Sequence, residues 1–244
     1  MTYHRQTIGT NLYVVDEIDS TNKELLENAA HYEHGAVFCS RKQTAGRGRR
    51  KREWHSQNGG LYFSVLLKDQ KNISKTYPFV LLSALAVVRC IHSCATHGIA
   101  IKWPNDIYIN HRKVCGILAE SSTRGNTTDI VIGIGINVNN NVSHIKNLRN
   151  PAVSLKECRE EKIDLLNFLD RIINEIDLLY FDYCENKFHL YLPELNRLLY
   201  AKGQTIEIKS TGNTRLVTPL SFTEDAKLLC LENGKEVEIS IGEI

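Results

Sequence analysis

Three strand-like segments follow one another in the middle of the chain, separated only by short turns. They are "IAIKWPNDIYI", "KVCGILAES" and "TDIVIGIGINVN", and the connecting "NHRK" and "TRGNT" are rich in turn-forming residues. Connections this short join antiparallel neighbours, because a parallel pair of strands needs a crossover of a dozen or more residues. The middle of the chain therefore predicts a mostly antiparallel sheet.

Two long apolar segments predict helices that flank this sheet. Residues 79–97 are almost continuously apolar, and a second helix is expected from Ile163 because its apolar residues step by three and four. This second stripe consists of Leu166, Leu169, Ile173, Ile176, Tyr180 and Tyr183. Beyond Gly203, short alternating strands predict a small β-barrel or sheet module. We therefore expect an α+β fold, with a mixed, mostly antiparallel sheet flanked by helices in residues 1–198 and a small C-terminal β-barrel in residues 199–244.

Composition excludes several classes of protein. The 244 residues carry 30 basic and 28 acidic side chains, a net charge of +2, so the chain lacks the overall positive excess of a nucleic-acid-binding protein. No apolar run reaches the roughly 18 to 20 residues that a membrane span needs, and the N-terminal residues do not form a signal peptide. The seven cysteines are scattered without a CxxC pair. These features predict a cytoplasmic protein with no membrane partner.

One group of metal-ligating residue types needs an interpretation. Cys90, His92, Cys94 and His97 lie close together in "RCIHSCATHG", but no second ligand pair follows at zinc spacing. On a helix, Cys90 and Cys94 share a face with small apolar residues. We interpret the group as core packing rather than a metal site.

The most basic stretch of the chain is "GRGRRKREW", residues 46–54. Glycines at 46 and 48 allow main-chain N–H groups to face an anion, and arginine side chains bind phosphate oxygens in pairs. Trp54 adds a flat aromatic face that suits a purine. Taken alone, this stretch is compatible with nucleic acid, with the phosphates of a nucleotide, or with a solvated loop.

Two further segments could carry chemistry. Lys102 in "IKWPNDIY" points to the opposite side of its strand from Ile101 and Trp103, so it either binds an anion or lies at the surface. In "GIGIN", Gly133 and Gly135 share one face of a strand, which indicates close approach of a ligand or tight packing within the sheet.

These segments together resemble a known family. "DSTN", "QTAGRGRR" with Trp54, "GLYFS", "KWPNDIY" followed by "GILAE", and "GIGINVN" occur in the order and spacing seen in biotin protein ligases. The resemblance implies a catalytic domain like that of class II synthetases, which forms biotinyl-5′-AMP from biotin and ATP. The biotin would then pass to one lysine of a biotin carboxyl carrier protein, and Mg²⁺ would accompany the ATP, held largely by phosphates and water.

The resemblance also implies the residues of the site, without a metal site made by the protein. Biotin binding is expected from Ser20, Thr21, Asn22, Gln43, Gly46, Arg47, Gly48, Arg49, Lys102 and Gly116. Binding of ATP and the adenylate is expected from Arg47, Arg49, Arg50, Arg52, Trp54, Lys102, Asn105 and Asn137. The expected catalytic residues are Lys102, Arg49 and Asp106, with Asp106 as a partner for the incoming lysine.

One of these assignments competes with a structural role. Thr21 and Glu24 have the spacing of a helix capping box, so capping and biotin binding both require the Thr21 hydroxyl. The two roles are compatible only if Ser20 or Asp19 caps the helix instead.

The resemblance also raises questions about partners. Some family members carry a DNA-binding domain before the catalytic one, whereas the ligase pattern here begins near Leu12, which predicts a short, single-function form with no DNA partner. Lys51 replaces a glycine that many members have in the basic loop. Two rival functions remain, a lipoate ligase of the same fold and a nucleic-acid-binding module that uses residues 47–52. A monomer and a homodimer are both compatible with the sequence.

Overall fold

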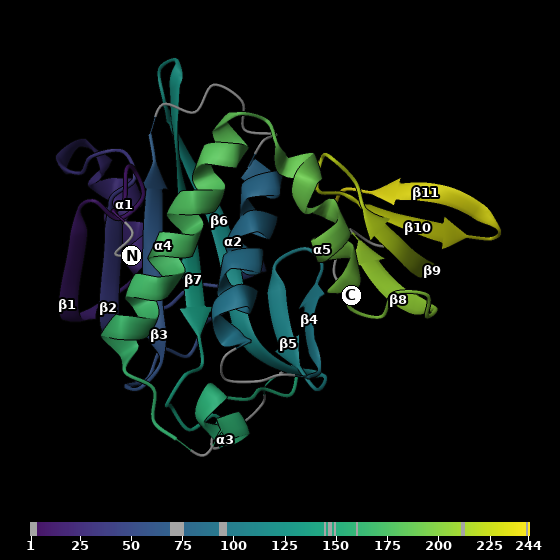
Figure 1. Cartoon of the computed structure of the whole chain (residues 1–244), viewed down its shortest axis with the longest axis horizontal. Helices are drawn as coiled ribbons and strands as arrows, with labels where there is room; N and C mark the ends of the chain where they lie inside the picture. The colour runs from purple at the N-terminus through teal and green to yellow at the C-terminus, as the bar shows by residue number, and fades with distance from the viewer. Residues whose placement is uncertain are drawn as a thin grey trace.

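A seven-stranded sheet forms the centre of the computed structural model, which describes residues 4–68, 76–92, 97–143, 145, 148, 150–159, 161–210, 213–242 and 244 (Figure 1). In chain order its strands are Leu12–Ile18 (β1), Val37–Gln43 (β2), Leu61–Leu67 (β3), Ile99–Lys102 (β4), Asp106–Ile109 (β5), Arg112–Arg124 (β6) and Thr127–Ile136 (β7). In space the order is β1-β2-β3-β7-β6-β5-β4, and only β1 and β2 are parallel. The predicted mixed, mostly antiparallel sheet is confirmed.

The two predicted hairpins lie where the turn residues stand. Asn110 and His111, both with positive φ, connect β5 to β6, and Gly125 at φ +60° lies in the turn between β6 and β7. Pro104 ends the preceding strand, and β4 stops at Lys102. These local signals fix the antiparallel order of the four strands β4 to β7.

Helices α2 (Thr76–Ile91) and α4 (Leu165–Cys184) cover one face of the sheet (Figure 1). The predicted stripe of α4 is wrong at Leu166, which is 51% exposed. Asp164 caps this helix by accepting the N–H groups of Leu166 and Asn167, so Leu166 lies in the first turn, pointing outward. The buried stripe instead runs through Phe168, Leu169, Ile172, Ile173, Ile176, Asp177, Leu179 and Tyr180.

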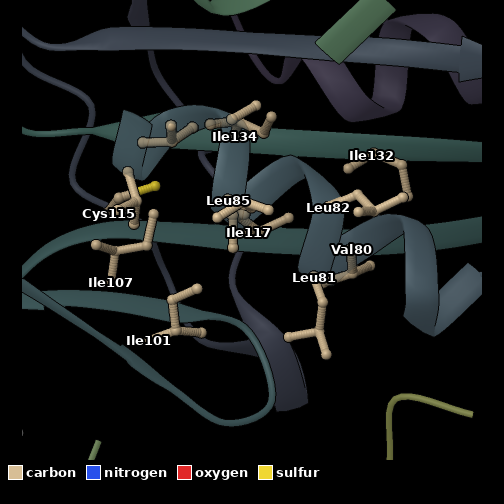
Figure 2. Packing of buried hydrophobic residues seen from close by; sticks show 14 of the residues in the cluster. Val80, Leu81, Leu82, Leu85, Ile101, Ile107, Cys115, Ile117, Ile132 and Ile134 are labelled. Carbon is tan, nitrogen blue, oxygen red and sulfur yellow. The ribbon is translucent and has the colours of Figure 1, made fainter. Parts of the chain in front are cut away.

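The main core lies between α2 and the sheet (Figure 2). Leu82 and Leu85 of α2 lie among the side chains of the strands, and Ile117, Ile132 and Ile134 face them from β6 and β7. Alternate residues of β7 therefore face this core, and the residues between them face the opposite side of the sheet.

The opposite side of the sheet is covered in part by helix α1 (Thr21–Glu27). Leu25 of α1 packs with Phe38, Leu66 and Val131 in a second, smaller apolar cluster. The remaining short helices are α3 (Leu155–Arg159), α5 (Leu192–Arg197) and the single-turn 3₁₀ segments Ala29–His31, Arg49–Lys51 and Phe188–Tyr191. Since α1 covers only one end, part of this face stays open toward β6 and β5.

The C-terminal strands form a separate four-stranded antiparallel sheet with the order β11-β10-β9-β8. They are Ile206–Ser210 (β8), Asn213–Phe222 (β9), Leu228–Glu232 (β10) and Lys235–Ile239 (β11). Of the two expected forms, the structure has the sheet rather than a closed barrel, because β8 and β11 are not paired in the described part of the chain and both remain edges.

This sheet packs directly against the rest of the molecule. Its buried side chains belong to the same apolar cluster as the main core, and Trp103 Nε1 donates a hydrogen bond of 3.2 Å to the Ala226 carbonyl. Asn196 Oδ1 accepts the N–H of Phe222 at 2.7 Å. The expected boundary between residues 198 and 199 stays a prediction.

Two expectations about smaller features can also be checked. Cys90 is 6% exposed and belongs to the core, as the packing interpretation requires, whereas Cys94 lies outside the described residues. Within the described ranges, no group of three or more His, Cys, Asp or Glu side chains could hold a metal ion. None of the described helices is both long enough and apolar enough to cross a membrane.

Candidate active site

A cavity opens on the α1 side of the sheet, between the start of α1, the basic loop and strands β5, β6 and β7. It brings together thirteen of the residues predicted for the site, which are Ser20, Thr21, Asn22, Gln43, Arg47, Gly48, Arg49, Arg52, Trp54, Lys102, Asn105, Asp106 and Gly116. Segments more than 90 residues apart in the sequence thus meet in one hollow.

Three predicted residues are not part of the cavity wall. Asn137 is 5% exposed, and its Oδ1 accepts a hydrogen bond of 3.0 Å from Asn140, so its amide serves the structure of the loop that follows β7. Arg50 lines a second hollow, which the basic loop forms with Leu118 and Glu120. Gly46 packs against the Trp54 carbonyl, which would lie 2.4 Å from a Cβ at this position.

The start of α1 answers the question about Thr21. Ser20 has extended backbone angles and its Oγ accepts the N–H of Lys23, so Ser20 is the N-cap, the alternative in which capping and ligand binding do not compete for the Thr21 hydroxyl. Asp19 binds the Ser20 N–H at 2.6 Å, and a hydrogen bond from Lys23 lowers the pKa of Asp19. The Thr21 hydroxyl is therefore directed into the polar network below the cavity.

That network joins buried side chains from four segments. Ser64, with no exposed surface, donates to Asn22 Oδ1 at 2.6 Å, since a carbonyl oxygen can only accept. The Thr21 hydroxyl lies 2.7 Å from Ser64 Oγ and 3.1 Å from Gln43 Oε1, and both oxygens are within reach of its hydrogen. Gln43 Oε1 accepts the Thr21 N–H at 2.8 Å, and Gln43 Nε2 donates to Ser56 Oγ at 2.8 Å. These hydrogen bonds hold the side chains of the network in place.

The glycines in "GIGIN" combine the two expected features, tight packing and a place beside the cavity. A Cβ on Gly133 would lie 2.0 Å from Asn22 Oδ1, and a Cβ on Gly135 would lie 2.6 Å from Trp54 Nε1. The glycines thus make room for side chains rather than for another backbone, and those two side chains are walls of the cavity.

Sequence reasoning missed Lys113, the first residue of "KVCGILAES". Its Nζ forms an ion pair of 2.6 Å with Asp106 Oδ2 and lies 5.3 Å from the centre of the Trp54 ring. Lys113 lines the cavity beside Gly116 and is mostly buried. The other oxygen of the pair, Asp106 Oδ1, is buried and has no hydrogen-bond partner among the residues that the structure describes. The missed signal was a basic residue seven positions after Asp106 on the next strand of the hairpin.

Lys102 has a different environment at the end of β4. Its Nζ lies 4.9 Å from the centre of the Tyr108 ring and 5.4 Å from that of Tyr200. Two aromatic rings therefore hold this ammonium, although Lys102 also contributes to the cavity wall.

The basic loop folds over one end of the cavity. Arg49 donates to Asn105 Oδ1 at 3.1 Å and to the Gly242 carbonyl at 3.3 Å, which ties the loop to the end of the C-terminal sheet. Arg50 and Lys51 have φ values of 56° and 59°. A left-handed conformation at Lys51 explains why a glycine suits this position in related sequences.

The fold and the site define a class of protein. It is an α+β protein with a mixed sheet, and the open face of this sheet carries a polar pocket lined by several basic side chains. The profile of the Biotin/lipoate A/B protein ligase family matches residues 14–137. The chain belongs to this family.

Individual relatives agree with this assignment. The chain is 39% identical over 189 residues to the bifunctional ligase/repressor BirA of Bacillus spizizenii, covering 75% of this chain and 58% of the relative. It is 34% identical over 157 residues to a biotin–acetyl-CoA-carboxylase ligase of Paracoccus denitrificans, covering 62% and 65% of the two chains. A solved structure of biotin protein ligase from Aquifex aeolicus in complex with biotin and ATP superposes with a TM-score of 0.86 at 28% identity, covering 96% of this chain and 97% of that one.

The contact between Gly133 and Asn22 leads to a first prediction. In Gly133→Ala the added methyl group displaces Asn22, which should weaken the binding of a small ligand in this cavity, with biotin as the test ligand, by about tenfold or more, as expected for one lost buried hydrogen bond. Isothermal calorimetry with biotin measures the change. Gly125→Ala is the control, because its Cβ meets nothing within 4 Å and its strained φ should lower stability without changing affinity. Unchanged biotin affinity in Gly133→Ala would remove Asn22 from the binding site.

Proposed function

We propose that the chain is an ATP-dependent biotin ligase that forms biotinyl-5′-AMP and transfers biotin to a lysine of a biotin carboxyl carrier protein. One observation carries the proposal: buried hydrogen-bonding groups at the start of α1 and the cations Arg47, Arg49 and Lys113 line the same cavity. A molecule with a polar head and a carboxylate tail fits such a cavity. The chain spans about 58% of the length of the Bacillus relative, so this activity rests on the site as well as on the likeness.

The chemistry follows from the charges in the cavity. A carboxylate oxygen of biotin bonds to the α-phosphorus of ATP while the bond to pyrophosphate breaks. Negative charge then increases around that phosphorus, and cations fixed in advance stabilise it. In the second step a lysine amine of the carrier attacks the biotinyl carbonyl carbon and AMP leaves. Asp106, close to the reacting groups, is our candidate to accept the proton that the amine loses.

The geometry favours Lys113 over Lys102 for the ammonium that binds the carboxylate and the α-phosphate. Lys113 lines the cavity with Asp106 as its counter-ion, whereas the Lys102 ammonium lies 4.9 Å and 5.4 Å from the centres of the Tyr108 and Tyr200 rings. An anionic substrate can replace or share the carboxylate partner of Lys113 without loss of packing. We assign Lys102 to the support of the cavity wall.

Nucleotide binding is proposed for the basic loop and Trp54. The indole lies across Gly116 and Gly135 with Lys113 Nζ 5.3 Å from its ring centre, and its Nε1 is buried without a partner among the described residues, so this nitrogen is a candidate donor to a ligand. A Mg²⁺ ion would enter with the triphosphate and would supply charge neutralisation of the leaving pyrophosphate. Asp106 Oδ1 fits a role as an additional oxygen ligand, since it has no partner among the described residues.

The experiment that tests the proposal is a transfer reaction. The protein is incubated with biotin, Mg-ATP and a biotin carboxyl carrier domain, and mass spectrometry should detect one biotinylated lysine. Absence of a mass gain, on a carrier that another ligase can modify, would refute the function.

Two rival functions are separated by simpler assays. Pyrophosphate release with biotin but not with lipoate would favour the biotin ligase over a lipoate ligase, which shares the fold. A nucleic-acid-binding module would instead bind duplex tightly with a steep salt dependence. The contacts of Arg47 and Arg49 with the cavity argue against that module. The carrier partner and the cytoplasmic location remain part of the proposal.

A further inference from the structure

Glu120 connects two parts of the cavity that are far apart in the sequence. It lies on β6, and its two carboxylate oxygens have different partners. Oε2 accepts a hydrogen bond of 2.8 Å from Asn22 Nδ2, and Oε1 forms an ion pair of 3.2 Å with Arg47 Nη1. One side chain thus touches both the start of α1 and the basic loop.

The bond to Asn22 belongs to a closed set. Asn22 Oδ1 accepts from Ser64, and Asn22 Nδ2 donates to the Leu118 carbonyl at 3.3 Å as well as to Glu120. Both amide hydrogens and the amide oxygen are therefore engaged within the protein. Asn22 contributes a wall to the cavity, and Glu120 is one of the groups that hold this wall in place.

The bond to Arg47 is of a different kind. It is a single contact at 3.2 Å to a guanidinium whose side chain is 41% exposed, whereas a phosphate or carboxylate in the cavity could bind the same guanidinium through two hydrogen bonds. A partly exposed ion pair of this kind contributes little stability. An anionic substrate group can therefore take Arg47 from Glu120 at small cost.

From this asymmetry we infer that Glu120 is a positioning residue. Glu120 holds Arg47 beside the cavity until the anionic group of a substrate binds this arginine in its place. Its hydrogen bond to Asn22 is kept in both states. The inference rests on the proposed function for the identity of the two ligands, biotin and ATP.

Direct binding of each ligand tests this role. In Glu120→Gln the amide oxygen can still accept from Asn22, but the charge that holds Arg47 is lost. The affinity for ATP, measured by calorimetry, should increase about two- to fivefold, the range expected for one partly exposed ion pair, and the affinity for biotin should not fall, because Asn22 keeps its acceptor. In Glu120→Ala, by contrast, the biotin affinity should fall by about tenfold, because Asn22 loses a charged acceptor.

A double-mutant cycle with Arg47→Ala shows whether Glu120 acts through this arginine. Glu120→Gln should no longer change ATP affinity when Arg47 is absent. Glu53→Gln is the matched control, since Glu53, like Glu120, lines the hollow beside the basic loop but pairs with His55 instead. An equal rise in ATP affinity for Glu53→Gln, or for Glu120→Gln without Arg47, would overturn the inference and indicate a general effect of charge.

The outcome can be separated from that of the proposed function. A wild-type protein that binds biotin and ATP but releases no pyrophosphate would refute the ligase while leaving the cycle valid. Failure of the wild type to bind ATP would overturn the inference as well, because Arg47 would then have no anionic substrate to receive.

Discussion

Lys113→Ala should reduce biotin-dependent pyrophosphate release by about 100- to 1000-fold, the loss expected when one preorganised electrostatic donor is removed from a reacting centre. Lys113 is the ammonium that shares the cavity floor with Asp106, Trp54 and Gly116. The substitution removes a positive charge at the point where the reaction builds up negative charge. The rate of pyrophosphate release at saturating biotin and ATP measures the effect.

Lys102→Ala is the informative comparison. The resemblance assigns the catalytic role to Lys102, whereas in the structure its ammonium lies 4.9 Å and 5.4 Å from the centres of the Tyr108 and Tyr200 rings. We expect the loss in Lys102→Ala to be at least tenfold smaller than in Lys113→Ala, a difference of about 1.4 kcal/mol in transition-state stabilisation. The opposite order would restore the assignment to Lys102. Since Lys113→Ala leaves Asp106 without its partner, melting temperatures of both variants must show that they are folded.

That Lys113 belongs to the cavity could not be predicted from the sequence, for a physical reason. Both lysines stand on strands of the same antiparallel array and both line the cavity, so alternation along a strand does not show which ammonium meets an anion. The position of Lys113 depends on a shift in register between Ile107 and Tyr108, which changes the pairing of β5 with β6. A bulge of this kind has no clear signal in the sequence.

Other features were predictable because they depend on neighbours in the chain. Short turns determine the hairpins, and the apolar run of α2 determines its burial. Whether the C-terminal sheet closes into a barrel depends instead on the pairing of strands that are distant in the sequence, and this sheet is open. The exposure of Leu166 depends on the start of its helix at Asp164. Likewise, the reason for Gly133 became clear only when Asn22 was found against it.

Asp177, a buried carboxylate outside the cavity, should have a large effect on the stability of the fold. Asp177 of α4 has no exposed surface and accepts the main-chain N–H groups of Gln6, Thr7 and Ile8 at 2.8, 3.0 and 2.6 Å. This side chain therefore fastens the segment before β1 to the helix that covers the sheet. The sequence gives little sign of it, since Asp177 interrupts an apolar stripe and looks like a break in the pattern.

Asp177→Ala should lower the free energy of unfolding by about 3 to 5 kcal/mol, because three main-chain donors lose their acceptor in a place that water reaches poorly. Such a loss is a large part of the roughly 5 to 15 kcal/mol that stabilises a typical domain, and it corresponds to a fall of roughly 10 °C in Tm. Asp170→Ala is the matched control: Asp170 lies two turns earlier on α4 and also contacts the N-terminal segment through Arg5, but its side chain is 59% exposed. That control should cost no more than about 1 kcal/mol. Thermal unfolding followed by circular dichroism measures both, and equal melting temperatures for the two variants would mean that the three hydrogen bonds of Asp177 are replaced by water.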